Sequence, residues 1–136
     1  NQTRYISDQP AGCVFGFDNQ RSNDQLVFIT EGIIDAIHIR GVALLGSSVN
    51  KQQLNILNEL KRKIVIVPDR DKNGDHLVDV AIDNGWSVSF PEWKPHINDI
   101  SDAVKHYGRL ATFGSIINAI NESPLKIKLI RKKWFN

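Results

Sequence analysis

The sequence predicts an α/β domain in which about four mainly parallel strands are covered by helices on both faces. Short apolar, partly β-branched runs alternate along the chain with segments whose apolar residues recur at helical spacing. The alternation is regular over residues 26–120 and is typical of a parallel sheet with crossover helices. A length of 136 residues suits one such domain with a single core.

The first half of the chain supplies two predicted strands and two predicted helices. Residues 26–30 have the composition of a buried strand, and residues 32–40 follow with apolar side chains at helical spacing. A second short apolar run covers residues 42–45. Asn50 then starts a helix, because Gln53 stands three residues later as its capping-box partner.

The second half continues the same alternation. Residues 64–67 give the strongest strand signal in the chain. Gly74 introduces a helix that the Asn-Gly pair at residues 84–85 ends. Residues 86–90 alternate like a strand, and two further helices are expected over residues 100–106 and 111–120.

Composition excludes several classes of protein. Hydrophobic residues make up 41% and charged residues 24% of the chain, as in ordinary globular proteins. No apolar run approaches the roughly 18 residues of a membrane span, and no signal peptide opens the sequence. The single cysteine, Cys13, forms neither an internal disulfide nor a zinc site, so we expect a reducing, cytoplasmic compartment. Because the sequence contains no methionine, we interpret it as a segment of a longer protein.

The net charge of +2 is unevenly distributed. Residues 126–136 hold five of the 17 basic residues and no acid, which leaves 12 basic and 15 acidic residues elsewhere. We therefore divide the chain into a lead-in (1–25), the α/β domain (26–120) and a basic tail (121–136).

The basic tail suits nucleic acid or an acidic partner, and a solvated terminus is the alternative. Alternating apolar residues over 125–130 also leave open a strand that docks on the sheet edge or on another protein. The candidate nucleic-acid contacts are Lys126, Lys128, Arg131, Lys132, Lys133 and Trp134.

Acidic side chains follow three of the predicted strands at the points where the strands end. Glu31 follows the first strand, Asp69 and Asp71 follow the third, and Asp99 follows the fourth. In parallel sheets these ends meet at one edge, where the chemistry collects. Side chains two residues apart in extended backbone point the same way. Asp69 and Asp71 should therefore face one site together, while Arg70 points elsewhere.

Carboxylates held so close repel one another unless a cation neutralises them. Hard oxygen ligands that leave room for water are what Mg²⁺ prefers. We therefore predict a site for Mg²⁺, with Mn²⁺ as a second possible ion, at Glu31, Asp69, Asp71 and Asp99. For an Asp-x-Asp pair taken alone, turn chemistry or a helix cap is the alternative interpretation.

These segments resemble the TOPRIM family, a metal-binding α/β module of primases, topoisomerases and some nucleases. Residues 26–36, LVFITEGIIDA, are similar to its first motif, and residues 64–74, IVIVPDRDKNG, to its second. Residues 45–50, LGSSVN, resemble a segment of bacterial-type primases, and residues 98–104, NDISDAV, a segment of phage primases. The resemblance covers about residues 12–120 and is greatest for primases of T4-like phages.

The resemblance implies a Rossmann-like TOPRIM fold and a role for individual residues. Glu31 matches the family glutamate, which acts with the metals or as a general base. Asp69 and Asp71 match the metal-binding pair, so these three residues are the catalytic candidates, and Asp99 matches the third acidic position. Gly46 matches a glycine that lets the backbone approach phosphate or metal. The candidate phosphate or nucleotide contacts are Gly32, Gly46, Ser47 and Ser48.

Two positions depart from the family pattern. Asn98 stands where phage primases usually have lysine, and Ser101 stands where bacterial-type primases have a further aspartate. We therefore expect the outer metal ligands to differ in this chain.

The function implied by the resemblance is that of a DNA primase, which makes RNA primers on single-stranded DNA during replication by nucleotidyl transfer. The implied partners are the DNA template, nucleoside triphosphates and a replicative helicase, with no membrane, in the host cytoplasm if a phage encodes the protein. Family primases also contain a polymerase segment and a zinc-binding domain upstream, so we expect this segment alone to synthesise no primer.

Two other functions remain open at this stage. A TOPRIM nuclease acting on DNA or RNA is the alternative enzyme, because an acidic metal site serves both chemistries. A DNA-binding or scaffold module with a degraded metal site is the third hypothesis, and the intact Glu31, Asp69 and Asp71 argue against it.

Overall fold

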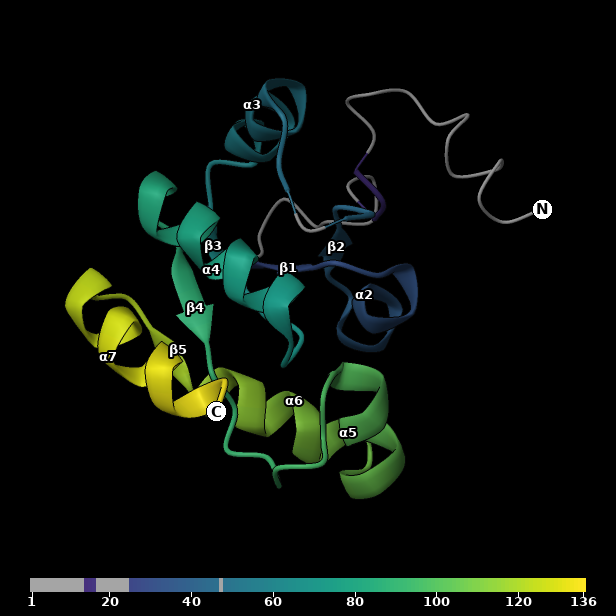
Figure 1. The fold of residues 1–136 in the computed structure, drawn as a ribbon. Helices are drawn as coiled ribbons and strands as arrows, with labels where there is room; N and C mark the ends of the chain where they lie inside the picture. The colour runs from purple at the N-terminus through teal and green to yellow at the C-terminus, as the bar shows by residue number, and fades with distance from the viewer. Residues whose placement is uncertain (1–13, 17–24, 47) are drawn as a thin grey trace.

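A five-stranded sheet lies between two layers of helices in the computed structural model, which describes residues 14–16, 25–46 and 48–136 (Figure 1). The strand order is β2-β1-β3-β4-β5. The first four strands are parallel, and β5 is antiparallel to β4. Their bounds are β1 (Leu26–Thr30), β2 (Val42–Ala43), β3 (Lys63–Ile66), β4 (Ser87–Ser89) and β5 (Ile120–Asn121). The predicted α/β class and mainly parallel sheet are confirmed.

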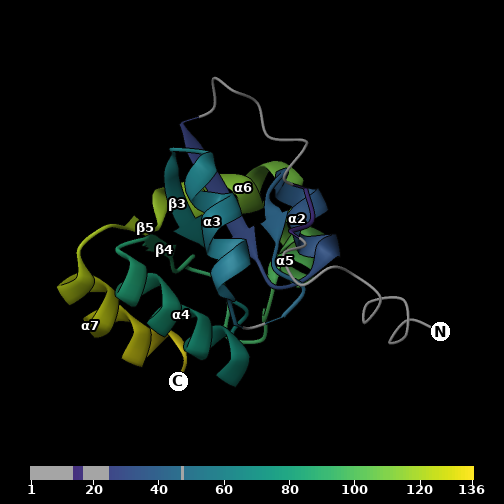
Figure 2. The same cartoon turned by 90° about the horizontal axis from the view of Figure 1, so that it is seen from above.

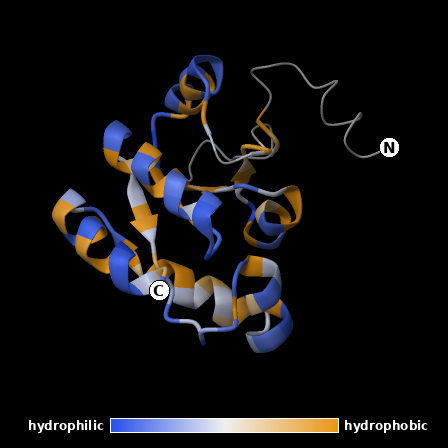
Figure 3. Ribbon diagram, viewed as in Figure 1, coloured by the Kyte–Doolittle hydropathy of each residue, from blue (hydrophilic) through white to orange (hydrophobic). Residues whose placement is uncertain are grey.

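The helices divide between the two faces of the sheet, as predicted. One face packs against α3 (Lys51–Glu59), α4 (Lys72–Asn84) and α7 (Pro124–Trp134), and the other against α2 (Ile33–Ile39), α5 (Ile100–Tyr107) and α6 (Arg109–Asn118). Successive residues of β1 show the division, since Val27 and Ile29 belong to the first core and Phe28 to the second. The helices carry hydrophobic and hydrophilic residues on different sides (Figure 3).

Local signals account for most of the helix ends. The Asn50 side chain accepts a hydrogen bond from the Gln53 backbone N–H, and the Gln53 side chain accepts one from the Asn50 N–H, which confirms the capping box of α3. Gly85 ends α4 with a φ of 71°, a conformation that favours glycine. The prediction that α4 starts at Gly74 is wrong by two residues, because Asp71 caps the helix.

The end of the chain is a helix and not a strand. Ser123 caps α7 and Pro124 occupies its first turn, two signals that start helices. Ile127 is fully buried, and Ile130 and Trp134 pack on the same core. These three positions are three and four residues apart, which is helical spacing. The option of a docking strand over residues 125–130 is therefore incorrect, and α7 lies beside α4 (Figure 2).

Candidate metal centre

The candidate centre lies at the topological switch point of the sheet, where β2 and β3 lie on opposite sides of β1. β1 pairs with β2 on one side and with β3 on the other, because the chain runs from β1 to β2 and then crosses over β1 to reach β3. Ligand sites of open α/β sheets lie outside the carboxyl ends of the strands at such a point. Glu31 follows β1 directly, and Asp69 follows β3 after two buried residues, so both stand at this edge.

Glu31 and Asp69 are joined by a hydrogen bond between their side chains. Two carboxyl groups can share such a bond only if one of them keeps a proton. Burial, followed by the bond to Glu31 and the nearby negative charges, raises the pKa of Asp69 to about 9. Burial also raises the pKa of Glu31, and Asp71 and Asp35 add to that rise. The pair therefore retains one proton at neutral pH when no cation is bound.

The chemistry of this pair fits a divalent cation. Glu31 Oε1 is buried and has no hydrogen-bond partner among the described residues. A buried acceptor without a donor is costly, and a metal ion would satisfy it while replacing the proton on Asp69. Carboxylate oxygens at one edge are the donor set that Mg²⁺ or Mn²⁺ takes.

Asp35 belongs to the same acidic group, although its role was not predicted. It is 7% exposed, and its Oδ1 accepts hydrogen bonds from the Ser101 N–H at 2.9 Å and the Ser101 hydroxyl at 2.7 Å. Its charge contributes to the raised pKa values of Glu31, Asp69 and Asp99. Ser101 thus holds a carboxylate in place and does not supply one.

Asp71 and Asp99 also cap helices α4 and α5. Asp71 Oδ1 accepts from the Gly74 N–H at 2.9 Å, and Asp99 Oδ1 accepts from the Asp102 N–H at 2.7 Å. The cap interpretation left open for the Asp-x-Asp pair is therefore correct for Asp71. Each cap bond engages one carboxylate oxygen of two. Burial raises the pKa of Asp99 despite its cap bond.

The predicted ligands come to one edge but do not converge on one point. Among the residues that the structure describes, no three His, Cys, Asp or Glu side chains form a group that could hold a metal ion. Glu31 and Asp69 are in direct contact, whereas Asp71 and Asp99 turn to the first turns of α4 and α5. The four-ligand set remains a prediction.

The loop that carries Asp69 and Asp71 is held from two sides. A Cβ on Gly74 would lie 1.7 Å from the Asp69 carbonyl oxygen, so the first turn of α4 packs directly on the Asp69 backbone. On the other side, the Arg70 N–H donates to the Asn98 carbonyl at 2.6 Å. The Arg70 side chain points away from the two aspartates, as predicted, and donates to the Lys94 carbonyl at 3.0 Å.

The predicted phosphate contacts start beside Glu31. The Leu45 N–H donates to the Glu31 carbonyl at 3.0 Å, so the loop that follows leaves the sheet at the metal edge. Gly46 and Ser48 are exposed in that loop, and a Cβ on Gly46 would meet nothing within 4 Å. Gly32 caps α2 at the same edge. Ser47, like Cys13, lies outside the described residues.

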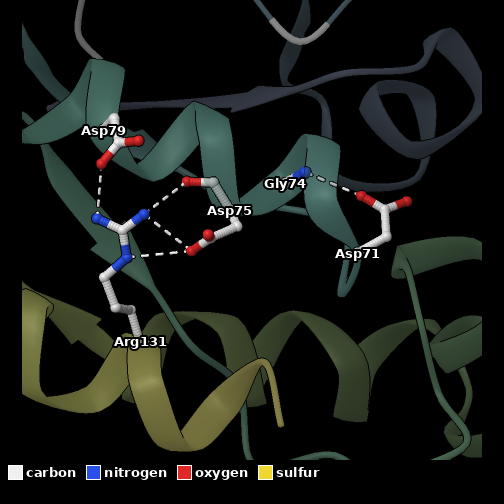
Figure 4. Close-up of polar contacts among 5 residues, drawn as sticks. All are labelled: Asp71, Gly74, Asp75, Asp79 and Arg131. Carbon is white, nitrogen blue, oxygen red and sulfur yellow. Dashed lines mark hydrogen bonds and ion pairs between the residues drawn. The ribbon is translucent and has the colours of Figure 1, made fainter.

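The candidate nucleic-acid contacts on α7 fall into two groups. Arg131 and Trp134 are half-buried and bonded to the protein, Arg131 to Asp75 and Asp79 of α4 and Trp134 to the Pro91 carbonyl (Figure 4). The exposed group consists of Lys126, Lys128, Lys132 and Lys133. Any contact with nucleic acid through α7 therefore depends on the lysines.

Comparison with models of known families gives a match. The profile of a family described as Toprim-like matches residues 28–104, which is more than half of the chain and includes Glu31, Asp69, Asp71 and Asp99. No curated protein gives a significant match. Of the helices in the described part of the chain, none is long and apolar enough to cross a membrane.

Proposed function

Because the chain belongs to the Toprim-like family, we propose that it is the catalytic metal-binding domain of a DNA primase. The observation that carries the proposal is the half-buried Glu31–Asp69 pair at the carboxyl ends of β1 and β3, which no cation among the described residues neutralises. In the proposed reaction, on a single-stranded DNA template, a 3′-hydroxyl loses its proton and attacks the α-phosphate of an incoming nucleoside triphosphate. The bond from the α-phosphorus to the bridging oxygen breaks, and pyrophosphate leaves.

Each acidic residue has a definite part in this proposal. Asp69, once its proton leaves, would hold Mg²⁺ together with Glu31, and Asp71 and Asp99 would add the carboxylate oxygens that the helix caps leave over. Bound divalent ions supply positive charge to the attacking and leaving oxygens of an in-line displacement. The raised pKa of Glu31 also suits a general base that accepts the proton of the attacking hydroxyl.

The acidic edge itself is equally suited to a nuclease, in which water replaces the hydroxyl as the attacking group. Two segments favour the primase. Residues 45–50 resemble a segment of bacterial-type primases and leave the sheet beside Glu31. Residues 98–104 resemble a segment of phage primases, and there Ser101 donates to Asp35, whose charge also contributes to the raised pKa of Asp99.

A paired assay on the full-length protein tests the proposal. Primer synthesis on single-stranded DNA and cleavage of DNA and RNA are measured in the same preparation, with Mg²⁺ and with Mn²⁺. Metal-dependent primer synthesis supports the primase, and cleavage without synthesis supports the nuclease. If neither activity is found and no metal binds, the domain has no catalytic metal site.

Contact with the template is proposed for the exposed lysines of α7. Each phosphate contact on a single strand should contribute about 0.7 to the slope of log affinity against log salt. Changing Lys126, Lys128, Lys132 and Lys133 to Gln should therefore flatten that slope, without removing the buried Ile127 as a truncation would. A salt titration with single-stranded DNA measures the slope, and an unchanged slope would assign these lysines no such contact. A replicative helicase and a cytoplasmic site of action are proposed on the family resemblance alone.

A further inference from the structure

Arg70, the residue between the two motif aspartates, connects three separate segments. Its backbone N–H donates to Asn98 in the loop before α5. Its guanidinium donates to the Lys94 carbonyl at 3.0 Å and to the Trp93 carbonyl at 3.4 Å, in the segment after β4. The same guanidinium lies 4.5 Å from the centre of the Trp134 ring on α7. A planar cation stacked on an aromatic ring and bonded to two carbonyls has little freedom to move.

Trp134 is itself fixed in place by the protein. Its Nε1–H donates to the Pro91 carbonyl at 2.8 Å, and its ring lies 5.5 Å from that of Phe90 and 4.9 Å from that of Phe135. Two turns of helix are anchored before it, by the buried Ile127 and by Arg131, which binds Asp75 and Asp79 of α4. Figure 4 shows that Asp71 caps the helix on which Asp75 and Asp79 stand.

From these contacts we infer that α7 is a brace for the metal-binding loop, with Arg70 and Trp134 as its positioning residues. Asp69 stands at the proposed metal edge and Asp71 caps α4, and the guanidinium of Arg70, which lies between them in the sequence, stacks on the Trp134 ring. The first turn of α4 also packs on the Asp69 backbone, because Gly74 has no Cβ to keep the two apart. The loop is thereby confined before any ion binds, which reduces the conformational freedom that metal binding must remove.

The inference extends the functional unit beyond the segment that the family profile recognises. That segment ends at residue 104, whereas the brace is formed by residues 124–134. The inference rests on the proposed function for its purpose, namely metal binding, but the contacts that form the brace do not depend on that function.

The first test measures Mn²⁺ affinity by calorimetry in the complete chain, at a temperature where every variant is folded. Trp134→Ala should weaken Mn²⁺ binding about tenfold or more, as loss of the groups that support metal ligands usually does. Trp134→Phe keeps an aromatic face over Arg70 and should restore most of the affinity. Arg70→Lys keeps the positive charge near the site but loses the hydrogen bonds to the Lys94 and Trp93 carbonyls. Its effect on Mn²⁺ affinity should not add to that of Trp134→Ala, because both variants disrupt the same contact.

Phe113→Ala is the matched control, because it removes an aromatic ring that packs on Phe28 over the other face of the sheet. It should lower the melting temperature and leave Mn²⁺ affinity unchanged. A role of Trp134 in stability alone would give the same result for Trp134→Ala, and that result would overturn the inference.

Amide hydrogen exchange in the metal-free protein gives a second, independent test. Trp134→Ala should speed exchange of the Arg70 and Gly74 amides, which bond to Asn98 and Asp71, and leave the Gln53 amide in the cap of α3 unchanged. Unchanged exchange at Arg70 and Gly74, or faster exchange with unaltered Mn²⁺ affinity, would refute the brace. If the wild type binds no Mn²⁺, the proposed function fails, and exchange alone still decides whether the brace exists.

Discussion

Asp75 and Asp79 on α4 lie against Arg131, whereas Glu31 and Asp69 at the strand ends lie against each other. Arg131 Nη2 is 2.8 Å from Asp75 Oδ1, and Arg131 Nη1 is 2.7 Å from Asp79 Oδ1, so the protein supplies the cation for these carboxylates. At the strand ends none of the residues that the structure describes supplies a cation to Glu31 and Asp69, and the pKa of Asp69 rises to about 9. The two acidic pairs differ in what neutralises them.

That difference separates a structural use of carboxylates from a functional one. The Arg131 contacts join α7 to α4, and one guanidinium offsets part of the charge of the two carboxylates without any external ion. The Glu31–Asp69 pair leaves a buried oxygen without a donor and keeps a proton in place of a cation. Such unbalanced groups in native structures usually indicate an ion or a catalytic role.

The largest expected effect is on catalysis. Asp69→Ala or Glu31→Gln in the full-length protein should reduce primer synthesis by roughly a hundredfold or more, because the charges that hold the transition-state clamp are lost. Asp79→Asn, which changes an aspartate paired with Arg131, is the control and should retain most of the activity. Activity is measured as primer yield at equal concentrations of folded protein. A folded Asp69→Ala variant with full activity would refute the assignment.

Metal binding at the strand-end carboxylates should increase the stability of the folded protein. At a hundred times its dissociation constant, Mg²⁺ should raise the free energy of unfolding by about 2.7 kcal/mol through binding to the folded state. The double variant Asp69→Ala, Asp71→Ala should lose this increase. Calorimetry and thermal melting with and without Mg²⁺ measure both quantities. Equal Mg²⁺ affinity in wild type and double variant would place the metal elsewhere.

Breaking the contacts of Arg131 with Asp75 and Asp79 should reduce the stability of the fold. Arg131→Gln should lower the free energy of unfolding by about 1–2 kcal/mol, because hydrogen bonds to charged groups are lost while the half-exposed aspartates regain water. Lys128→Gln removes the same charge from an exposed position of α7 and should change stability by less than about 0.5 kcal/mol. Urea unfolding compares the two. Equal losses would mean that the Arg131 contacts contribute nothing specific.

The smallest effect, per unit of pH, is expected for the metal-free protein. The pKa of Asp69 is about 9 in the folded state and 3.8 as the reference value for the unfolded chain, so between these values the folded protein binds the extra proton. The free energy of unfolding should therefore fall as pH rises from 5 to 9, by no more than the roughly 1.4 kcal/mol per pH unit that a difference of one bound proton gives. Asp69→Asn imitates the protonated form and should flatten this dependence in urea unfolding. Parallel pH profiles for wild type and Asp69→Asn would contradict the assignment.

How far the sequence predicts the fold depends on the element. Apart from Thr30 and Lys63, β1 and β3 are apolar, and they were predicted because central parallel strands are buried on both faces. β5 was missed because it has two residues, too few for any periodicity. α7 was missed because alternating residues from Leu125 to Leu129 resemble a strand, although Ser123 and Pro124 signal a helix start.

How much of the site the sequence predicts depends on whether a contact follows from sheet topology or joins distant parts of the chain. Glu31 and Asp69 could be predicted as neighbours because parallel topology brings strand ends to one edge. The bond from Ser101 to Asp35 joins residues 66 positions apart, and no local pattern encodes it. The retained proton on Asp69 follows from burial, which only the folded chain defines.

The contact between Gly74 and the Asp69 backbone also limits which sequences can carry this loop. In a library that places all amino acids at position 74, every side chain would bring a Cβ to 1.7 Å from a carbonyl oxygen, and selection should return glycine alone. Position 114, where a Cβ meets nothing within 4 Å, should accept alanine freely. Mutational tolerance would thus map the rigid side of the metal loop without any metal being added.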